Sequence, residues 1–148
     1  MSSRAVTVLV PGFDVAAYAA EALDSLRAQT HEHWTAVLVD DASTDDTTRI
    51  FADAAATDPR FRFVRHDRQR GLGAARNTGL ALVDTPYTAF LDADDRMRPD
   101  ALTRLTDTLE HTGSDFVVGA YVRLRPDAEG AGYTAGDVQP WVTAATDP

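Results

Sequence analysis

The feature that most constrains the fold is a repeated alternation between short apolar runs and segments whose apolar residues have helical spacing. The first two runs, AVTVLV at residues 5–10 and WTAVLV at residues 34–39, are rich in β-branched residues and have the length of buried strands. The segment between them carries apolar residues at helical spacing: Val15, Tyr18, Ala22, Leu23 and Leu26. Such alternation predicts an α/β fold with an open, mostly parallel, Rossmann-like sheet flanked by helices.

The alternation continues to about residue 121. Three further strands are predicted, at residues 61–64, 87–91 and 115–121. Helical patterns separate them, and the later two helices are predicted over residues 74–82 and 99–113. The order of the elements is therefore strand, helix, strand, repeated along the chain, as in a parallel sheet with crossover helices.

Polar residues are expected to cap the first two helices. Asp14 stands just before the first helical pattern, and Ser43 is followed three residues later by Asp46, the spacing of a capping pair. After residue 125 the glycines and prolines are scattered and no periodicity remains. We therefore expect a folded domain at residues 1–125 and an irregular tail at residues 126–148.

The composition excludes several classes of function. All 14 basic residues are arginine and there is no cysteine, so a P-loop lysine, Schiff-base chemistry and thiolate zinc sites are excluded. The net charge of −9 without a basic stripe argues against nucleic acid as a partner. The sequence has no apolar stretch of about 20 residues and no pattern of a signal peptide, so we expect a cytoplasmic location.

Acidic residues follow two of the predicted strands. Asp40 and Asp41 end the second strand, and Asp92, Asp94 and Asp95 follow the strand at residues 87–91. In an open parallel sheet, ligands bind at the carboxyl ends of the strands, so both groups are predicted at the ligand-binding edge. Clustered carboxylates repel one another unless a cation neutralises them, and oxygen ligands of this kind suit Mg²⁺ or Mn²⁺.

The segment RGLGAARNTG at residues 70–79 adds an element for binding anions. It lacks the third glycine of a dinucleotide fingerprint, because Arg76 occupies that position, and it follows the third strand rather than the first. What remains is a glycine loop, a helix start and the cation of Arg76, which together favour a phosphate ligand. A divalent cation between the carboxylates and a nucleotide diphosphate would account for both features.

Four motifs together resemble the family 2 glycosyltransferases of GT-A fold. They are VTVLVPGFDVAAYAAEALDSLRAQT, AVLVDDASTDDT, RGLGAARNTGL and YTAFLDADD, in the family's order and spacing over residues 5–125. The resemblance implies an inverting enzyme that moves a sugar from a nucleotide diphosphate donor, a UDP-sugar here, to an acceptor hydroxyl with Mg²⁺ or Mn²⁺. It also implies saccharide, lipid-linked or polyol-phosphate acceptors in cell-wall or surface polysaccharide synthesis, and peripheral membrane association through other parts of the protein.

The resemblance assigns the nucleotide side of the site to the first two strand ends. Pro11 and Phe13 match the turn that lies along the base and ribose. Asp41 matches the acid that accepts a hydrogen bond from a uracil-type base, with Asp40 beside it. This turn usually carries a tyrosine and an asparagine, whereas this chain has Phe13 and Asp14, so no side-chain hydrogen bond is assigned to the turn.

The resemblance assigns the phosphate side to two further motifs. Arg76 and Asn77 match the A-R-N segment that lines the diphosphate pocket. Asp92 and Asp94 match the D-x-D motif, with Asp94 as a metal ligand and Asp92 near the ribose and the metal. Asp95 is expected to support the metal ligands or to cap the following helix.

No residue matches the family's general base. Asp115, Asp127 and Asp137 are present, but none lies in the context of the base motif, and none is assigned. Members of the family run to roughly 220 residues or more, so the resemblance implies that residues 1–125 form the nucleotide-sugar-binding domain of a longer enzyme. The tail at residues 126–148 would then lead into the acceptor-binding part.

Other functions remain alternatives. A sugar nucleotidyltransferase would use the same metal and diphosphate, but it needs a glycine-rich basic signature that PGFDVAAY after the first strand lacks. A phosphoacceptor receiver domain needs a lysine that the chain does not contain. A nucleotide-binding domain without catalysis is the third alternative. His31 and His33 in QTHEHW have no evident third metal ligand and are interpreted as loop residues.

Overall fold

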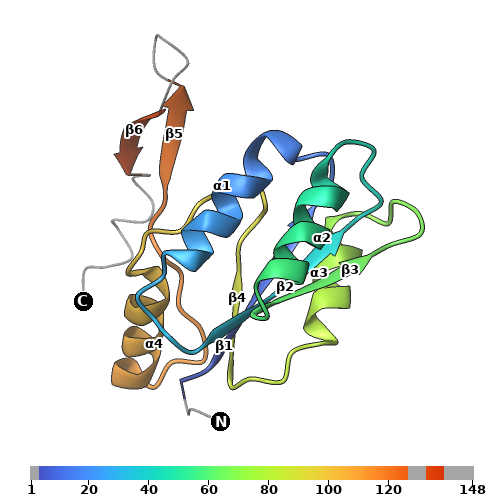
Figure 1. Ribbon diagram of the computed structural model, residues 1–148. Helices are drawn as coiled ribbons and strands as arrows, with labels where there is room; N and C mark the ends of the chain where they lie inside the picture. The colour runs from blue at the N-terminus through green and yellow to red at the C-terminus, as the bar shows by residue number, and fades with distance from the viewer. Residues whose placement is uncertain (1–3, 127–132, 139–148) are drawn as a thin grey trace. The chain divides into compact units, whose positions relative to one another are not determined.

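The computed structural model describes residues 4–126 and 133–138 (Figure 1). The chain divides into two compact units, Met1–Thr106 and Asp107–Pro148, which are considered separately. The first unit contains a four-stranded sheet with its covering helices, and the second contains a two-stranded sheet. The predicted division of function at residue 125 stays a prediction.

The sheet of the first unit is parallel throughout. Its strands are β1 (Val6–Gly12), β2 (Trp34–Asp40), β3 (Phe61–Arg65) and β4 (Tyr87–Phe90), in the order β3-β2-β1-β4. The register pairs Gly12 with Asp40 and Asp40 with Arg65, so the carboxyl ends of the three strands β1, β2 and β3 are level. The α/β fold with a parallel sheet is confirmed.

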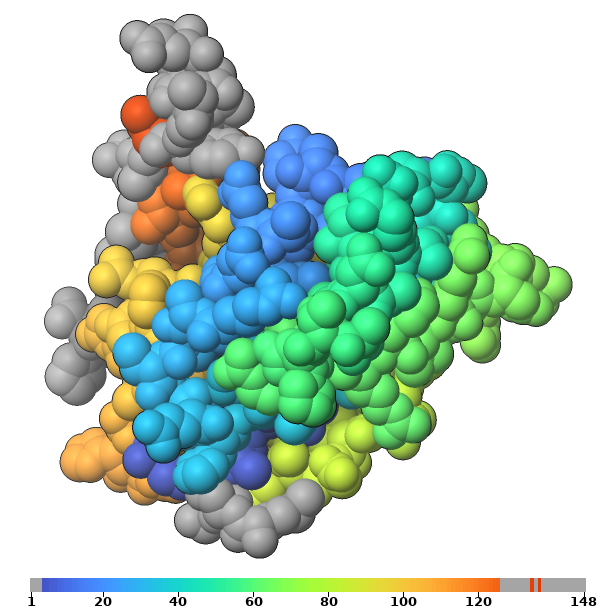
Figure 2. Space-filling model, viewed as in Figure 1, coloured from blue at the N-terminus to red at the C-terminus, as the bar shows by residue number. Residues whose placement is uncertain are grey.

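Helices cover both faces of this sheet because successive residues of its central strand point to opposite sides. Val6, Val8 and Val10 of β1 pack on one side with α1 (Ala16–Arg27) and α2 (Thr47–Thr57). Leu9 packs on the other side against α3 (Leu72–Leu80). Figures 1 and 2 show α1 and α2 side by side over the sheet.

The core on the α1 and α2 side is closely packed around the end of β1. Phe51 of α2 is fully buried, and a Cβ atom at Gly12 would lie 2.9 Å from its Cζ. The ring thus fills the space that the missing side chain of Gly12 leaves, which brings α2 down onto the strand end. Glycine at position 12 is therefore a packing requirement at the point where the chain leaves the sheet.

Helix α4 (Ala101–Thr112) begins in the first unit and ends in the second. Leu102 near its start is buried in the core with α1, and the Gln29 side chain accepts a hydrogen bond of 3.0 Å from the Leu102 N–H. Gly113, at the predicted stop, has a φ of 66° and takes the left-handed conformation that ends a helix.

The prediction of a strand at residues 115–121 is wrong. Those residues form no strand, and Phe116 and Val118 are 78% and 69% exposed. The second unit instead pairs β5 (Val122–Pro126) with β6 (Tyr133–Val138) as an antiparallel pair. β6 was not expected, because YTAGDV has small and polar residues in place of an apolar run; the rest of the predicted tail lies outside the described residues.

Over residues 4–126 and 133–138, the structure contains no helix that is both long enough and apolar enough to cross a membrane.

Candidate functional site

The acidic residues singled out from the sequence lie at the carboxyl ends of the strands, and Arg76 and Asn77 lie on α3. The turns after β1 and β2 are held together by backbone hydrogen bonds, with the Asp41 N–H donating to the Gly12 carbonyl over 2.9 Å. The turn after β4 is attached in the same way, because the Ala93 N–H donates to the Pro11 carbonyl over 3.1 Å. Three separate motifs of the sequence thus meet at one edge of the sheet, as predicted.

Side chains from the turn after β2 and from the first residue of α2 cap helix α1. Three consecutive backbone N–H groups at its start, those of Asp14, Val15 and Ala16, donate to side-chain oxygens of Ser43, Thr47 and Asp45 over 3.0, 2.9 and 2.9 Å. These bonds satisfy donors that a helix start leaves unpaired. They also fix the turn after β1 against the turn after β2.

The two capping roles predicted from the sequence are therefore wrong. The Asp14 side chain does not cap α1; Asp14 has a φ of 49°, and its carboxylate accepts the Thr44 N–H over 2.7 Å. Ser43 and Asp46 make no capping pair at α2: the N-cap residue, Asp46, makes no side-chain cap hydrogen bond, and the Thr47 N–H donates to Asp45 Oδ1 over 2.9 Å. Asp14 and Ser43 instead make hydrogen bonds between the two turns, a pairing that local spacing cannot show.

Asp40 is fully buried and its carboxylate is engaged inside the protein. One oxygen accepts the Ser43 N–H over 2.9 Å, and the other accepts the Thr48 hydroxyl over 2.6 Å and lies 3.2 Å from Arg65 Nε. These contacts shape the turn after β2. Asp40 therefore lies beside Asp41 in the chain, but its oxygens face protein donors.

Asp41 is only 3% exposed and binds the loop that precedes α3. Its Oδ1 lies 2.6 Å from His66 Nδ1 and accepts the Arg70 N–H over 2.8 Å, and its Oδ2 accepts the Gly71 N–H over 2.7 Å. Burial acts to raise the pKa of Asp41, but the hydrogen bonds from His66, Arg70 and Gly71 together hold that pKa below its usual value. Asp41 is therefore a carboxylate at neutral pH.

Sequence reasoning did not identify His66. The β2–β3 register pairs Asp40 with Arg65, so the next residues, Asp41 and His66, leave the sheet side by side. The chain separates them by 25 residues, and no local spacing connects them. Only the strand pairing could have revealed the contact.

Arg76 and Asp92 form an ion pair that joins the two phosphate-side motifs. Arg76 Nη2 donates to both oxygens of Asp92, over 2.9 and 3.1 Å. The guanidinium carbon also lies 5.7 Å from the centre of the Phe90 ring. Asn77, the other predicted residue of this segment, is exposed on α3. The structure thus brings Arg76 to the acidic turn, as the anion-binding hypothesis requires.

The turn after β4 carries unbalanced negative charge. Asp94 and Asp95 are exposed, and the Asp95 N–H closes the turn onto the Asp92 carbonyl over 2.9 Å. Partial desolvation, followed by the charges of Asp94 and Asp92, raises the pKa of Asp95. A cation at this turn would relieve that repulsion.

The turn after β4 can supply only some of the ligands that a hard divalent cation needs. In the described part of the chain, no three Asp, Glu, His or Cys side chains converge closely enough to hold a metal by themselves. Asp92, Asp94 and Asp95 offer carboxylate oxygens of the kind that Mg²⁺ and Mn²⁺ prefer, and Mg²⁺ commonly takes one or two carboxylates with substrate phosphates. Such a cation would be shared between the turn and a phosphate ligand.

The nucleotide side of this edge has an aromatic surface. Pro11 is buried at the end of β1, whereas Phe13 in the turn is 37% exposed. Phe13 and the acidic turn therefore lie at the ends of neighbouring strands, β1 and β4, with part of a ring available for stacking.

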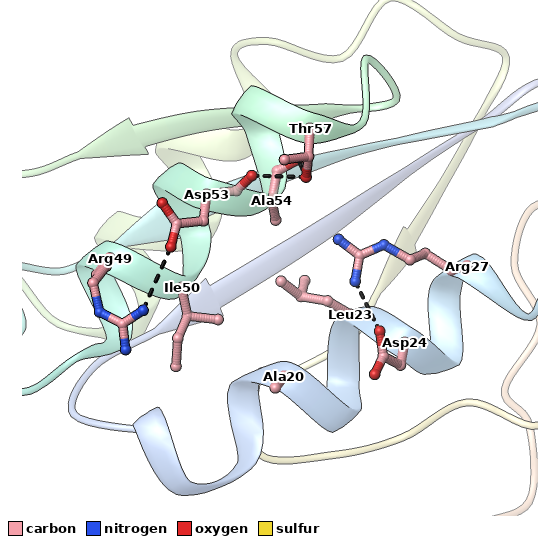
Figure 3. Close-up of a pocket in the computed structure, with 9 residues that line it drawn as sticks. All are labelled: Ala20, Leu23, Asp24, Arg27, Arg49, Ile50, Asp53, Ala54 and Thr57. Atoms are coloured by element: carbon pink, nitrogen blue, oxygen red, sulfur yellow. Dashed lines mark hydrogen bonds and ion pairs between the residues drawn. The ribbon is translucent and has the colours of Figure 1, made fainter.

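A hollow of about 240 Å³ lies elsewhere, between α1 and α2 (Figure 3). Its charged lining residues are paired, Arg27 with Asp24 over 2.8 Å and Arg49 with Asp53 over 3.5 Å. None of the predicted site residues lines it. It is a groove on the helical layer and contributes nothing to the strand-end site.

In the part of the chain that the structure describes, no residue is assigned as a general base for this site. Asp115 is exposed and belongs to the second unit. Asp137 lies in β6, and Asp127 is outside the described residues.

Comparison with known proteins agrees with this geometry. Residues 7–132 match the family described as Glycosyl transferase family 2. The succinoglycan biosynthesis protein ExoO of Rhizobium meliloti (strain 1021) is 37% identical over 113 residues, which are 76% of this chain and 32% of ExoO. The chain spans between 18% and 48% of the length of the first two curated relatives that it matches.

Two solved structures share the fold. TarS from S. aureus, in complex with UDP-GlcNAc, has a TM-score of 0.70 at 26% identity, over 75% of this chain and 32% of TarS. The mannosyltransferase PcManGT from Pyrobaculum calidifontis, in complex with GDP-Man and Mn²⁺, has a TM-score of 0.64 at 30% identity, over 82% of this chain and 36% of PcManGT. The four sequence motifs, the parallel sheet and the family match agree: the chain belongs to glycosyl transferase family 2.

Proposed function

We propose that this chain is the donor-binding part of an inverting glycosyltransferase and holds a nucleotide diphosphate sugar, a UDP-sugar, with Mg²⁺ or Mn²⁺ at the carboxyl ends of its strands. The observation that carries the proposal is the pairing of Arg76 with Asp92 beside the acidic turn. This pairing places a cation that can bind phosphate next to carboxylates that can bind a metal ion. Binding of a diphosphate together with its metal ion needs both.

Asp92 and Asp94 would hold the metal, and Asp95 would support them by adding negative charge. When bound, the metal neutralises the diphosphate as it leaves the sugar. Arg76 and Asn77 would line the diphosphate from α3. Arg76 already contacts Asp92, so it can turn from one anion to another without crossing the site.

The base would lie along Pro11 and Phe13, with Asp41 as the acceptor for its ring N–H. Phe13 offers an exposed ring, and Asp41 is an ionised acceptor on the neighbouring strand end. Asp40 would act beside it by holding the turn in place. The partly exposed aromatic surface and the buried acceptor together suit a flat base with a polar edge.

The relatives support this proposal at the level of chemistry. TarS is in complex with UDP-GlcNAc, and PcManGT with GDP-Man and Mn²⁺. ExoO acts in succinoglycan biosynthesis, which favours a role in cell-wall or surface polysaccharide synthesis. The acceptor would be a saccharide, a lipid-linked sugar or a polyol phosphate.

Calorimetry of UDP binding, with Mn²⁺ and with EDTA, tests the proposal. We expect binding to depend on Mn²⁺, and Asp94→Ala to remove the metal-dependent part while the protein stays folded, because an exposed carboxylate makes few packing contacts. The matched control is Asp24→Ala, an exposed aspartate on α1 that should leave binding unchanged. Equal UDP affinity in EDTA would contradict the metal assignment.

A further inference from the structure

We infer that His66 is a positioning residue for the base-binding part of the site, acting through Asp41. The inference rests on the proposed function and goes beyond it, because it names the residue that orients the acceptor and the acceptor atom that remains for the base. His66 follows β3, is buried, and bridges Asp41 at the end of β2 to Thr78 on α3.

The protonation of Asp41 fixes the direction of the first hydrogen bond. The pKa of Asp41 is lowered, so its side chain is a carboxylate that can only accept. His66 Nδ1, 2.6 Å from Asp41 Oδ1, must therefore carry a hydrogen and donate it. This holds for the neutral Nδ1–H tautomer and for the imidazolium.

The Thr78 hydroxyl fixes the other side of the ring. It lies 2.8 Å from His66 Nε2 and can rotate to donate to a neutral nitrogen or to accept from a protonated one. The ring is thus held at both nitrogens in either protonation state. Thr78 is two residues beyond Arg76 on α3. The His66 ring therefore links Asp41, on the base side of the site, to the helix that carries Arg76.

The pattern of donors around Asp41 identifies the free acceptor position. Among residues 4–126 and 133–138, Oδ1 receives two donors, His66 Nδ1 and the Arg70 N–H, while Oδ2 receives one, the Gly71 N–H. A carboxylate oxygen accepts about two hydrogen bonds, so the unused acceptor position is on Oδ2. The geometry therefore assigns Oδ2 as the atom that accepts a hydrogen bond from the ring N–H of the base. His66, by donating to Oδ1, would keep the carboxylate in one orientation.

Loss of His66 should then alter base selection in addition to stability. Without the ring, Oδ1 loses a charge-assisted hydrogen bond, and the backbone N–H groups of Arg70 and Gly71 alone hold the carboxylate. Uracil has a ring N–H to offer Oδ2 and cytosine has none, so the ratio of UDP to CDP affinity reports the orientation of the acceptor. A hydrogen bond to a charged group contributes about 1.5–3 kcal/mol, which corresponds to a tenfold or larger preference for UDP in the unmutated chain.

The test measures UDP and CDP binding by calorimetry with Mn²⁺, and urea unfolding, for three variants of the full chain. His66→Leu removes the donor and should reduce the UDP preference about tenfold. His66→Asn keeps an N–H near the position of Nδ1 and should restore most of the preference. His31→Leu is the control, since His31 is also buried, with Nε2 2.8 Å from the Arg4 carbonyl, away from the site.

The outcomes separate the possible roles. A folded His66→Leu variant that keeps the full UDP preference would overturn the inference and leave His66 a purely structural residue. If His66→Leu does not fold, a fourth variant, Thr78→Val, decides: a UDP preference equal to that of the unmutated chain overturns the inference, whereas a reduced preference that His66→Asn does not show supports it. If the unmutated chain binds UDP only weakly and equally in EDTA, the proposed function fails first, and this inference fails with it.

A measurement on the unmutated protein gives a check that needs no variant. The long-range ¹⁵N–¹H spectrum of the histidine rings should show a hydrogen on Nδ1 of His66 at neutral pH. A His66 ring protonated at Nε2 alone would overturn the assignment, because Asp41 would then face an acceptor.

Discussion

Arg76 uses a single nitrogen, Nη2, to contact both carboxylate oxygens of Asp92, at 2.9 and 3.1 Å, while its buried Nε has no hydrogen-bond partner among the described residues. The guanidinium therefore has a donor that no described residue uses. A cation that binds Asp92 would compete with Arg76, and a diphosphate would offer Arg76 a second anion with several acceptor oxygens.

Arg76→Leu should therefore have opposite effects on two ligands. Without nucleotide, Mn²⁺ affinity should stay the same or rise, because the variant removes a competing positive charge. With Mn²⁺ present, UDP affinity should fall about tenfold or more, since a charge-assisted hydrogen bond is typically lost. Calorimetry of each ligand checks both effects. A parallel fall in Mn²⁺ affinity without nucleotide would contradict the competition.

Asp95→Asn should raise the thermal unfolding midpoint at pH 7 in the absence of metal. The pKa of Asp95 is raised, so its ionisation disfavours the folded state once the pH exceeds the unfolded-state pKa of about 3.9. The gain should vanish near pH 3, where the side chain is protonated in both states, and it should shrink when Mn²⁺ is added.

Thermal unfolding followed by circular dichroism at the two pH values measures this difference. Asp84→Asn, an exposed aspartate away from the turn, is the control and should show no such pH dependence. A destabilised Asp95→Asn variant at pH 7 would mean that the carboxylate makes a stabilising contact that outweighs the repulsion.

Gly12→Ala should destabilise the protein by about 1–3 kcal/mol, the usual cost of overpacking a core. The new methyl group would lie 2.9 Å from Phe51 Cζ and 3.1 Å from Val15 Cγ2, and Phe51 is fully buried and cannot move aside easily. Gly73→Ala on α3 is the matched control. Nothing lies within 4 Å of a Cβ there, so alanine should stabilise the helix by about 1 kcal/mol. Urea unfolding measures both.

The 148-residue polypeptide should bind nucleotide and metal but transfer sugar negligibly. The donor and its leaving diphosphate are matched by residues 11–95, whereas no positioned base for the acceptor hydroxyl is found among the described residues. Absence of such a base typically costs about 10²–10⁴ in rate, and an incomplete acceptor pocket costs positioning as well. An assay against a panel of donors and acceptors tests this. Robust transfer would direct attention to Asp115, Asp127 and Asp137.

The sequence predicted the parallel sheet well because each strand is recognisable by itself. AVTVLV and WTAVLV are continuous apolar runs, and a run buried on both faces needs no information from its partners. The segment at residues 115–121 has the same character but is exposed, and β6 has a polar sequence. The strand wrongly predicted at residues 115–121 and the unpredicted strand β6 have the same cause. In this part of the chain, strand pairing determines the structure more than composition does.

The candidate site was predicted at the level of motifs and not of contacts. The proximity of Arg76 to Asp92 followed from where strand ends meet, and the structure brings these two residues together. The internal partners of Asp40 and Asp41 could not be predicted, since they come from Thr48, Arg65, His66 and the Arg70–Gly71 backbone, which depend on turn geometry. A carboxylate at a strand end can bind a ligand or shape a loop, and the residue type alone does not distinguish the two.

The capping of α1 by Ser43, Asp45 and Thr47 has a consequence for the order of folding. Its first-turn donors lie about thirty residues from their acceptors, so this turn cannot gain its caps until β1 and β2 have come together. The later turns of α1 depend on local hydrogen bonds and can form early. The end of α1 nearest the strand ends should therefore form late in folding and open first. Amide hydrogen exchange at Asp14, Val15 and Ala16 should then report the separation of the turns after β1 and β2, and not the fraying of α1 alone.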